Sequence, residues 1–248
     1  MGHTEPMRGT TVIGVIFKNM EAELTPMKQT PIHHAHNPDL LALIPKDAKR
    51  IVEIGCSSGA LAREYKKTNP TVYYTGIEID PAYAEVASTF CDRVIALDIE
   101  NTDPDYLRSE LGGDCWVFGD VLEHLRDPWK VLQNIRSSLL PGASLVACIP
   151  NAQHWSLQAR LAVGDFRYED SGLLDRTHLR WFTRRTMLDL FRKTGFVVKD
   201  ARARIFEEPA RAAFLPIVRS MALAAGGDGE AAIRDATPLQ YVFRVAAE

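Results

Sequence analysis

The sequence predicts an α/β fold, a doubly wound and mainly parallel sheet with helices on both faces. Two observations predict it. From residue 50 onward, five short apolar runs alternate with segments that carry apolar residues at helical spacing. Polar or acidic residues then stand where these runs end, which is the edge at which such sheets bind ligands. The 248 residues fit one sizeable domain with appendages.

The elements of this sheet follow in order along the chain. A short helix at 39–45 stops at Pro45, and Asp80 with Pro81 supplies the cap and first residue of a later helix. We expect strands at 50–55, 72–79, 93–97, 114–120 and 144–150, with helices between them at 60–68, 81–90, 103–111 and 128–139.

The two ends of the chain carry additions to this alternation. Residues 1–38 are predicted to form an arm or lid, with a candidate strand at 11–18. The histidines His33, His34 and His36 in this segment could cover a ligand or form an incidental solvated cluster. The domain then spans 39–248, with acceptor-site inserts at about 151–182 and 206–232. Within this later part we expect an irregular stretch at 151–182, helices at 184–194 and 208–222, a loop at 226–229, and strands at 195–204 and 238–247.

Composition excludes several function classes. The net charge is −3 and no basic run exceeds two residues, so there is no strong nucleic-acid or membrane-surface signal. The four cysteines form no CxxC pair and are expected to be buried thiols of a reducing cytoplasm. No apolar stretch is long enough to span a membrane, and the N-terminus lacks the layout of a signal peptide. A cytoplasmic protein is the expectation.

The segment "VEIGCSSGALA" follows the first predicted strand. Gly55 and Gly59 allow a sharp turn that exposes backbone N–H groups to a ligand at a helix N-terminus. The spacing is Gly-x-Ser-x-Gly, which differs from the Gly-x-Gly-x-x-Gly of dinucleotide sites. By itself, the loop is weak evidence for a cofactor, because a plain strand-to-helix turn is the alternative interpretation.

Carboxylates at successive strand ends favour a cofactor site. Glu78 ends the second strand about twenty residues after the loop, where a carboxylate can accept both hydroxyls of a ribose. Asp98 ends the third strand, within reach of an adenine amine, and Glu53 lies in the first. Three solvated acids are the alternative interpretation.

Taken together, "VEIGCSSGALA", "GIEID", "ALDIE" and "DVLEHL" resemble the class I S-adenosylmethionine (SAM) dependent methyltransferases. The resemblance implies a Rossmann-like sheet of seven strands in which the last one, "PLQYVFRVAA", inserts antiparallel. It also implies that Glu53 lies near the methionine end, that Glu78 holds the ribose, and that SAM is the cofactor. The implied cofactor-binding residues are Glu53, Gly55, Cys56, Ser57, Ser58, Gly59, Glu78, Ile79, Asp98, Ile99 and Asp120.

A second group of polar residues follows the fourth strand in "GDVLEHLRDPW". Asp120, Glu123 and His124 would share one face if the segment were helical. Two interpretations stay open. In one, His124, His178 or His154, together with Asp120, acts as the acid/base group that removes the acceptor proton. In the other, Asp120, Glu123, His124 and His178 bind Mg or Mn.

Three closer resemblances bear on the acceptor. The acid-x-x-Glu-His segment with a later "HLRWFT" is similar to metal-dependent small-RNA 3′-terminal 2′-O-methyltransferases, although this chain has Asp120 where they have glutamate. "EHL" also occurs in quinone-pathway O-methyltransferases. The set "DVLEHLRDPW", "IPNAQHW" and "GLLDRTHLRWFTRRT" most resembles bacterial glycan and natural-product methyltransferases, which implies a sugar hydroxyl as acceptor.

The sequence therefore predicts O-methylation of a sugar or sugar-containing metabolite, with a quinone precursor or an RNA 3′ end as alternative acceptors. A dinucleotide-dependent oxidoreductase is the alternative from another class. Aromatic side chains, among them Phe166 and Tyr168, could line the acceptor pocket or pack in the core. A homodimer could form through the apolar insert at 206–232. The candidate acceptor-binding residues are Asn151, His154, Trp155, Asp175, Arg176, Arg180 and Trp181.

Overall fold

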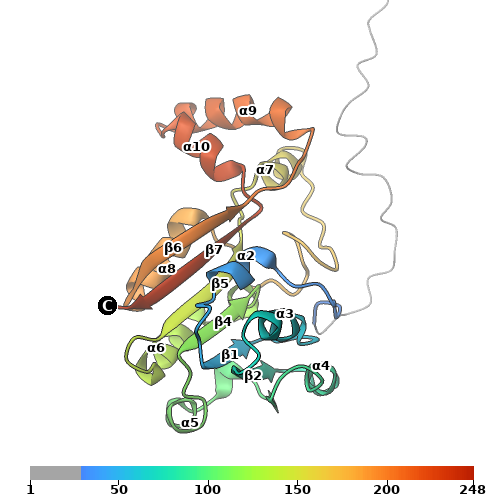
Figure 1. Cartoon of the computed structure of the whole chain (residues 1–248). Coiled ribbons are helices and arrows are strands. Elements are labelled where there is room, and N and C mark those ends of the chain that lie inside the picture. The colour runs from blue at the N-terminus through green and yellow to red at the C-terminus, as the bar shows by residue number, and fades with distance from the viewer. Residues whose placement is uncertain (1–28) are drawn as a thin grey trace, which may run out of the picture.

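The computed structural model describes residues 29–248, and the candidate strand at 11–18 lies outside them (Figure 1). Its seven strands form one sheet in the order β3-β2-β1-β4-β5-β7-β6, with β7 antiparallel to both neighbours. This confirms the predicted fold. The strands are β1 (Arg50–Ile54), β2 (Tyr73–Glu78), β3 (Arg93–Ala96), β4 (Cys115–Gly119), β5 (Ser144–Pro150), β6 (Phe196–Arg204) and β7 (Gln240–Ala247).

The order of the strands creates a switch point between β1 and β4. The chain moves outward from β1 through β2 to β3, then returns to place β4 on the other side of β1. The first five strands are parallel, so their carboxyl ends meet at one edge. In such sheets the crevice at the switch point is where ligands bind.

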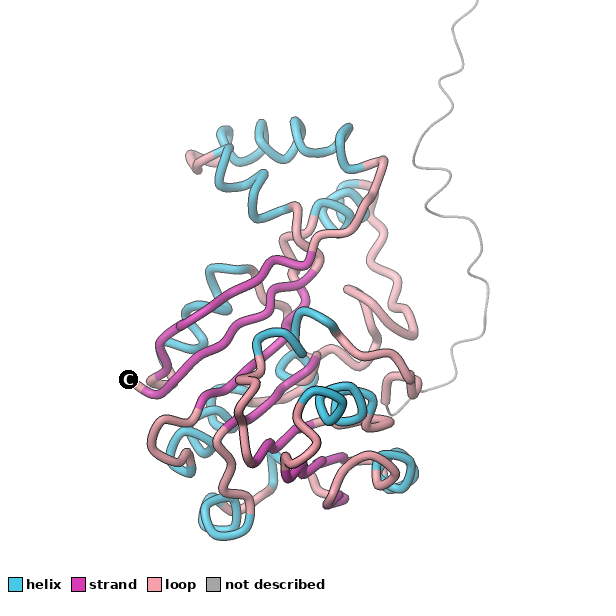
Figure 2. The backbone as a smooth tube through the Cα atoms, in the orientation of Figure 1, coloured by secondary structure: helices cyan, strands magenta, loops and turns pink. Residues whose placement is uncertain are grey.

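Helices cover both faces of the sheet (Figure 2). The sheet therefore separates two clusters of core residues, one on each face. Leu61 and Tyr65 belong to a cluster on one face, while Leu132 and Leu190 belong to the cluster on the other. The first face carries α2 (Pro38–Leu43), α3 (Ala60–Thr68) and α4 (Pro81–Ala87). The second carries α5 (Pro104–Glu110), α6 (Pro128–Ser138) and α8 (Arg184–Lys193).

Polar caps begin several of these helices. Asp80 accepts hydrogen bonds from the backbone N–H groups of Ala82 and Tyr83, and Pro81 is the first helical residue, as predicted. Thr183 and Thr186 form a reciprocal capping box at α8. The start of α4 is thereby fixed directly after Glu78.

Three further helices lie beyond the ends of β6 and β7, namely α7 (Trp155–Ala162), α9 (Arg211–Ala224) and α10 (Gly229–Ala236) (Figure 1). The predicted irregular stretch 151–182 thus contains a helix, and the predicted loop at 226–229 leads directly into α10. Both differences have the same reason: Trp155, Val218 and Ala236 form a small core of their own, which supports short helices that periodicity alone does not reveal.

The described residues bear on two expectations from composition. All four cysteines are free and buried, as predicted. No helix in residues 29–248 has the length and apolar character needed to cross a bilayer.

Candidate active site

A cavity of about 690 Å³ opens at the switch point of the sheet. Its walls come from the carboxyl ends of β1, β2 and β4, from the arm residues 29–33, and from the loop between α7 and α8. This volume is in the usual range for a pocket that holds a cofactor and a small substrate.

The loop after β1 presents its backbone to this cavity. Gly55 has φ +69°, and a Cβ there would lie 2.6 Å from Val121 Cγ2, so glycine is required. Ser57 lines the cavity with φ +48° and donates its backbone N–H to Glu78 Oε2 at 2.8 Å. The loop is therefore held against the end of the second strand.

Glu78 is a fixed carboxylate at the cavity wall and is 1% exposed. Its Oε1 accepts hydrogen bonds from the Asp80 backbone N–H at 3.1 Å and from Gln29 Nε2 at 2.8 Å. Together with the bond from Ser57, three donors orient the group. A neighbouring pair of ribose hydroxyls would meet a carboxylate that is already in position.

Beyond Glu78, the cavity wall continues with Ile79, Asp98 and Ile99. Asp98 accepts hydrogen bonds from the Glu100 backbone N–H and the Asn101 side chain, which orient its carboxylate. Ile79 is 59% exposed, an apolar side chain available to a flat ring. The structure thus brings together the predicted ribose and adenine residues.

Four residues of the predicted cofactor set do not line the cavity, which corrects their assignment as direct contacts. Glu53 lies beside the core cluster under α2, α3 and α4, where it accepts a hydrogen bond from Tyr74 Oη at 2.9 Å. Cys56 packs into that same core, and Ser58 donates to the His33 carbonyl. Gly59 caps α3 with φ +72°. For Glu53 the reason is the alternation of side-chain direction along β1.

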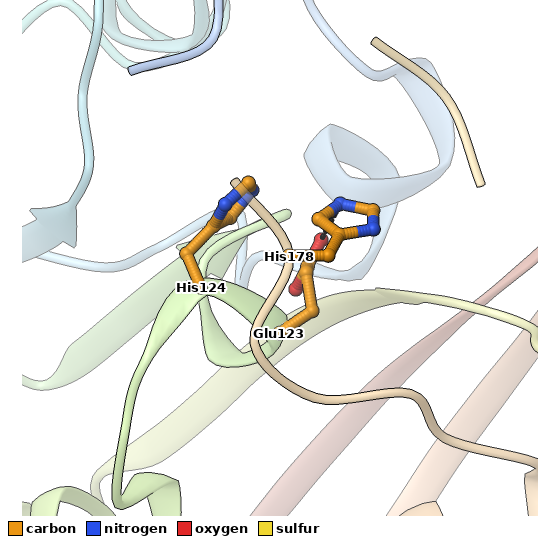
Figure 3. Close-up of side chains that lie close together, drawn as sticks. All are labelled: Glu123, His124 and His178. Atoms are coloured by element: carbon orange, nitrogen blue, oxygen red, sulfur yellow. Dashed lines mark ion pairs between the residues drawn. The ribbon is translucent and has the colours of Figure 1, made fainter. Parts of the chain in front are cut away.

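Glu123, His124 and His178 form a second group of polar side chains in the cavity (Figure 3). Glu123 and His124 come from the short 3₁₀ turn η2 (Leu122–His124) after β4, and His178 comes from the loop before α8. One ligand atom from each lies within 4.8 Å of the other two. His178 Nε2 lies 3.9 Å from Glu123 Oε1.

Hydrogen bonds fix both imidazole rings through their Nδ1 atoms. His124 Nδ1 lies 3.2 Å from the Thr177 carbonyl oxygen and 3.0 Å from Thr177 Oγ1, and His178 Nδ1 lies 3.3 Å from the Leu173 carbonyl. A carbonyl can only accept, so each contact favours a proton on Nδ1 and a lone pair on Nε2. Burial lowers the pKa of His124, and burial with the neighbouring His124 lowers the pKa of His178 to about 4.

Glu123 is buried without a hydrogen-bond partner for either carboxylate oxygen among the described residues. Burial, with further contributions from Asp120 and Asp175, raises its pKa well above the ordinary value. An unpartnered carboxyl beside two neutral imidazoles is costly to retain in a folded protein, and such groups are frequent at functional sites.

Asp120 departs from the predicted arrangement. It precedes η2 with φ +56°, so it shares no helical face with Glu123 and His124, and it stands outside the group that they form with His178. Its Oδ1 accepts instead from Gln240 Nε2 of β7. Asp120 still lines the cavity, and burial raises its pKa to about 6. Of the four residues predicted as metal ligands, Glu123, His124 and His178 are the three that lie together.

Replacing Asp120 by asparagine is expected to stabilise the protein by about 1–2 kcal/mol at pH 7.5. Asparagine tolerates the left-handed backbone and still accepts from Gln240, but it carries no charge. The folded state holds the Asp120 proton more tightly than the unfolded state, whose ordinary pKa is 3.8. The cost of the charge is therefore present above pH 6 and vanishes below about pH 4. Denaturant unfolding at pH 7.5 and pH 4 measures this, and an equal gain at both values would contradict it.

Three predicted acceptor residues lie outside the cavity. The Asn151 side chain donates to the carbonyls of Asp235 and Pro238. His154 caps α7, with Nε2 placed 3.2 Å from Glu208 Oε2, and Trp155 donates to the same oxygen. All three are occupied in joining β5 to the α7–α9–α10 helices, which corrects the prediction that His154 could be the base.

The other four acceptor candidates lie in the loop between α7 and α8, and only two of them line the cavity. Asp175 and Arg176 line the cavity. Arg180 and Trp181 do not: the Arg180 guanidinium donates to the Arg126 carbonyl, and Trp181 is 38% exposed, with its ring 6.0 Å from that of Phe166. These two assignments are corrected as well.

Several residues that contact the candidate site were not predicted from the sequence. Gln29 and Thr30 approach Glu78 and Asp175 from the arm, Thr177 contacts His124, and Gln240 holds Asp120. Thr177 stood between two residues that were singled out. The other three carried no usable signal, because their contacts join segments far apart in the sequence.

A comparison with protein-family models finds a match to a methyltransferase domain over residues 30–201. The chain belongs to this methyltransferase family. It is a SAM-dependent methyltransferase, as the motifs predicted, and the dinucleotide-dependent oxidoreductase is set aside.

Among curated proteins, the methyltransferase is 26% identical to a ubiquinone biosynthesis O-methyltransferase of Cereibacter sphaeroides (strain KD131 / KCTC 12085) over 172 residues, 68% of each chain. It is 28% identical over 127 residues, 46% of this chain and 52% of the other, to a protein of the same description from Histophilus somni (strain 2336).

Solved structures share the fold of this methyltransferase. The putative methyltransferase in complex with the Haloferax volcanii Trm112 activator has a TM-score of 0.57 at 16% identity, covering 85% of this chain and 88% of that one. A possible histamine N-methyltransferase from Thermotoga maritima also has a TM-score of 0.57, at 19% identity, covering 84% and 86%. At these identities the likeness concerns the fold alone.

Proposed function

We propose that this enzyme transfers the methyl group of SAM to a hydroxyl of a small aromatic acceptor, of the class to which quinone precursors belong. The observation that carries the proposal is the group Glu123, His124 and His178 in the same cavity as Glu78. Two strand spacings separate β2 from β4, roughly 10 Å, so a cofactor whose ribose is held at Glu78 can extend its methyl group toward the imidazoles.

The state of the imidazoles favours an acidic hydroxyl. Methyl transfer to oxygen requires that the hydroxyl lose its proton as the new bond forms, and Nε2 of His124 offers a lone pair for it. Lowered pKa values make both histidines weak bases. A phenol, whose pKa is about 10, is much more easily deprotonated than an aliphatic alcohol, so it is the better match. The two curated relatives, both described as ubiquinone biosynthesis O-methyltransferases, support the same class.

The same three residues also fit a divalent cation, which would take the Nε2 lone pair of His124 in place of the acceptor proton, and we include this as the second form of the proposal. Glu123 has two carboxylate oxygens without hydrogen-bond partners, and each imidazole has its Nδ1 tied to a carbonyl, as is usual for histidines that bind metals through Nε2. Mixed carboxylate and imidazole donors suit Mn or Mg. A bound cation would supply Lewis acidity that lowers the pKa of an acceptor hydroxyl.

A sugar hydroxyl, which the sequence motifs favoured, is the weaker match. Phe166, Tyr168 and Trp181, the aromatic side chains expected to pack against a sugar ring, lie outside the cavity lining, and Trp155 belongs to the α7–α9–α10 core. An RNA 3′ end stays an alternative, without a basic surface in the sequence to recommend it.

An acceptor panel with radiolabelled SAM tests the proposal. The panel contains catechol-type phenols, glycosides and a short RNA with a free 3′ end, and each is incubated with and without Mn²⁺. We expect label on the phenols, and we expect the His124→Ala variant to lose this transfer while it still binds SAM. Label on glycosides or RNA but not on phenols would refute the aromatic acceptor.

A further inference from the structure

A chain of hydrogen bonds leads from His124 back to the arm. His124 Nδ1 lies 3.0 Å from Thr177 Oγ1, and Thr177 Oγ1 donates to Asp175 Oδ1 at 2.6 Å. The other oxygen of Asp175 accepts a hydrogen bond from Thr30 Oγ1 at 2.9 Å. The two threonine hydroxyls are themselves 3.3 Å apart. Asp175 is 2% exposed, so water competes little for these contacts.

The directions of these bonds favour the same tautomer of His124 as the Thr177 carbonyl does. A threonine hydroxyl has one hydrogen, and the Asp175 carboxylate can only accept, so the hydrogen of Thr177 Oγ1 points to Asp175. The same oxygen must then accept at its contact with His124. The proton of the neutral ring therefore sits on Nδ1, and Nε2 keeps its lone pair.

Residues 29 and 30 contact both Glu78 and this series of hydrogen bonds. Gln29 donates to Glu78, and the next residue, Thr30, donates to Asp175. Tyr83 of α4 holds the segment in place, because its hydroxyl accepts from the Ile32 backbone N–H at 3.0 Å and lies 3.3 Å from the Thr30 carbonyl. Residues 29–32 are thus held between Glu78 and Asp175, two of the carboxylates that line the cavity.

We infer that Thr177 and Asp175 are positioning residues that, together with the Thr177 carbonyl, hold His124 in the tautomer protonated at Nδ1, and that Thr30 completes this relay. The inference rests on the proposed role of His124 in methyl transfer. The segment 29–30 would then have two roles, because it contacts Glu78 through Gln29 and stabilises Asp175 through Thr30.

Substitution of Thr177 separates a positioning role from a packing role. Thr177→Val keeps the volume and removes the hydroxyl, and we expect kcat to fall roughly 10- to 100-fold while KM for SAM changes little. Thr177→Ser retains the hydroxyl and is expected to restore most of the rate. Thr30→Val should show a smaller loss in the same direction, again rescued by serine. Thr71→Val, on the surface away from the cavity, is the control.

Nitrogen NMR of histidine-labelled protein gives a readout that does not depend on activity. We expect His124, assigned by comparison with His124→Ala, to carry its proton on Nδ1 in the wild type. In Thr177→Val only the backbone carbonyl of residue 177 still favours Nδ1, so we expect a measurable share of the proton on Nε2. Should Thr177→Val not fold, Asp175→Asn, which keeps the shape but weakens the pull on the hydroxyl, takes its place.

The outcomes separate this inference from the proposed function. An unchanged tautomer in the variants, or a serine variant as impaired as the valine variant, would overturn the relay. Failure of the wild type to methylate any acceptor would instead refute the proposed function, and the NMR result would still decide whether the relay sets the tautomer.

Discussion

The Glu78→Gln variant is expected to bind SAM roughly 30- to 150-fold more weakly than the wild type, a loss of about 2–3 kcal/mol. Both oxygens of Glu78 already accept backbone N–H groups, one from Ser57 and one from Asp80. The amide nitrogen of glutamine cannot accept, so the substitution leaves one of these donors facing another donor. It also removes the charge that strengthens bonds to ribose hydroxyls.

Isothermal titration with SAM measures this loss. Glu85→Gln is the matched control, since it removes the same charge from an exposed position on α4, the helix that begins directly after Glu78. We expect the control to bind SAM as the wild type does. Wild-type affinity in Glu78→Gln would contradict the placement of the ribose at this carboxylate.

The position of the candidate cofactor residues Glu78 and Asp98 at one cavity could be predicted because it depends on strand ends. In a parallel sheet, the carboxyl ends of successive strands share one edge, so Glu78 and Asp98 fall beside the same cavity wherever the exact boundaries lie. Which face a side chain takes within a strand is a finer matter. Glu53 stands only two residues from Gly55, yet it points into the opposite core and bonds to Tyr74.

The arrangement of the candidate acid/base or metal-binding residues could be predicted only in part, because it depends on loops. Glu123 and His124 were found since their motif is local. Asp120 was misplaced because its left-handed backbone and its bond to Gln240 cannot be derived from residue spacing. Asn151 and His154 carried polar groups of the expected kind, but the chain turns away after β5 and uses them to anchor the start of α7.

In metal-depleted protein, we expect Mn²⁺ to stabilise the folded wild type and so to raise its unfolding temperature. At a Mn²⁺ concentration a hundred times Kd, the free energy of unfolding should increase by about 2.7 kcal/mol. Glu123, His124 and His178 provide the donor set, and its assembled geometry in the folded state gives the cation a preference over the unfolded chain. Glu123→Gln removes the anionic donor and is expected to lower Mn²⁺ affinity at least roughly tenfold. Glu100→Gln, which removes a carboxylate from the cavity wall outside this group, is the control.

The pH dependence of this binding identifies the donor. Because burial raises the pKa of Glu123, the carboxyl without a cation keeps its proton at pH values where an exposed glutamate is charged. The cation must displace that proton, so Mn²⁺ affinity rises with pH until Glu123 is ionised in the free protein. Titrations in buffers of different ionisation enthalpy should show protons released on binding by the wild type, and fewer by Glu123→Gln. Equal stabilisation of the wild type and Glu123→Gln by Mn²⁺, or no change in the unfolding temperature of the wild type, would contradict a cation site at Glu123. The imidazoles would then act as acid/base groups without a cation.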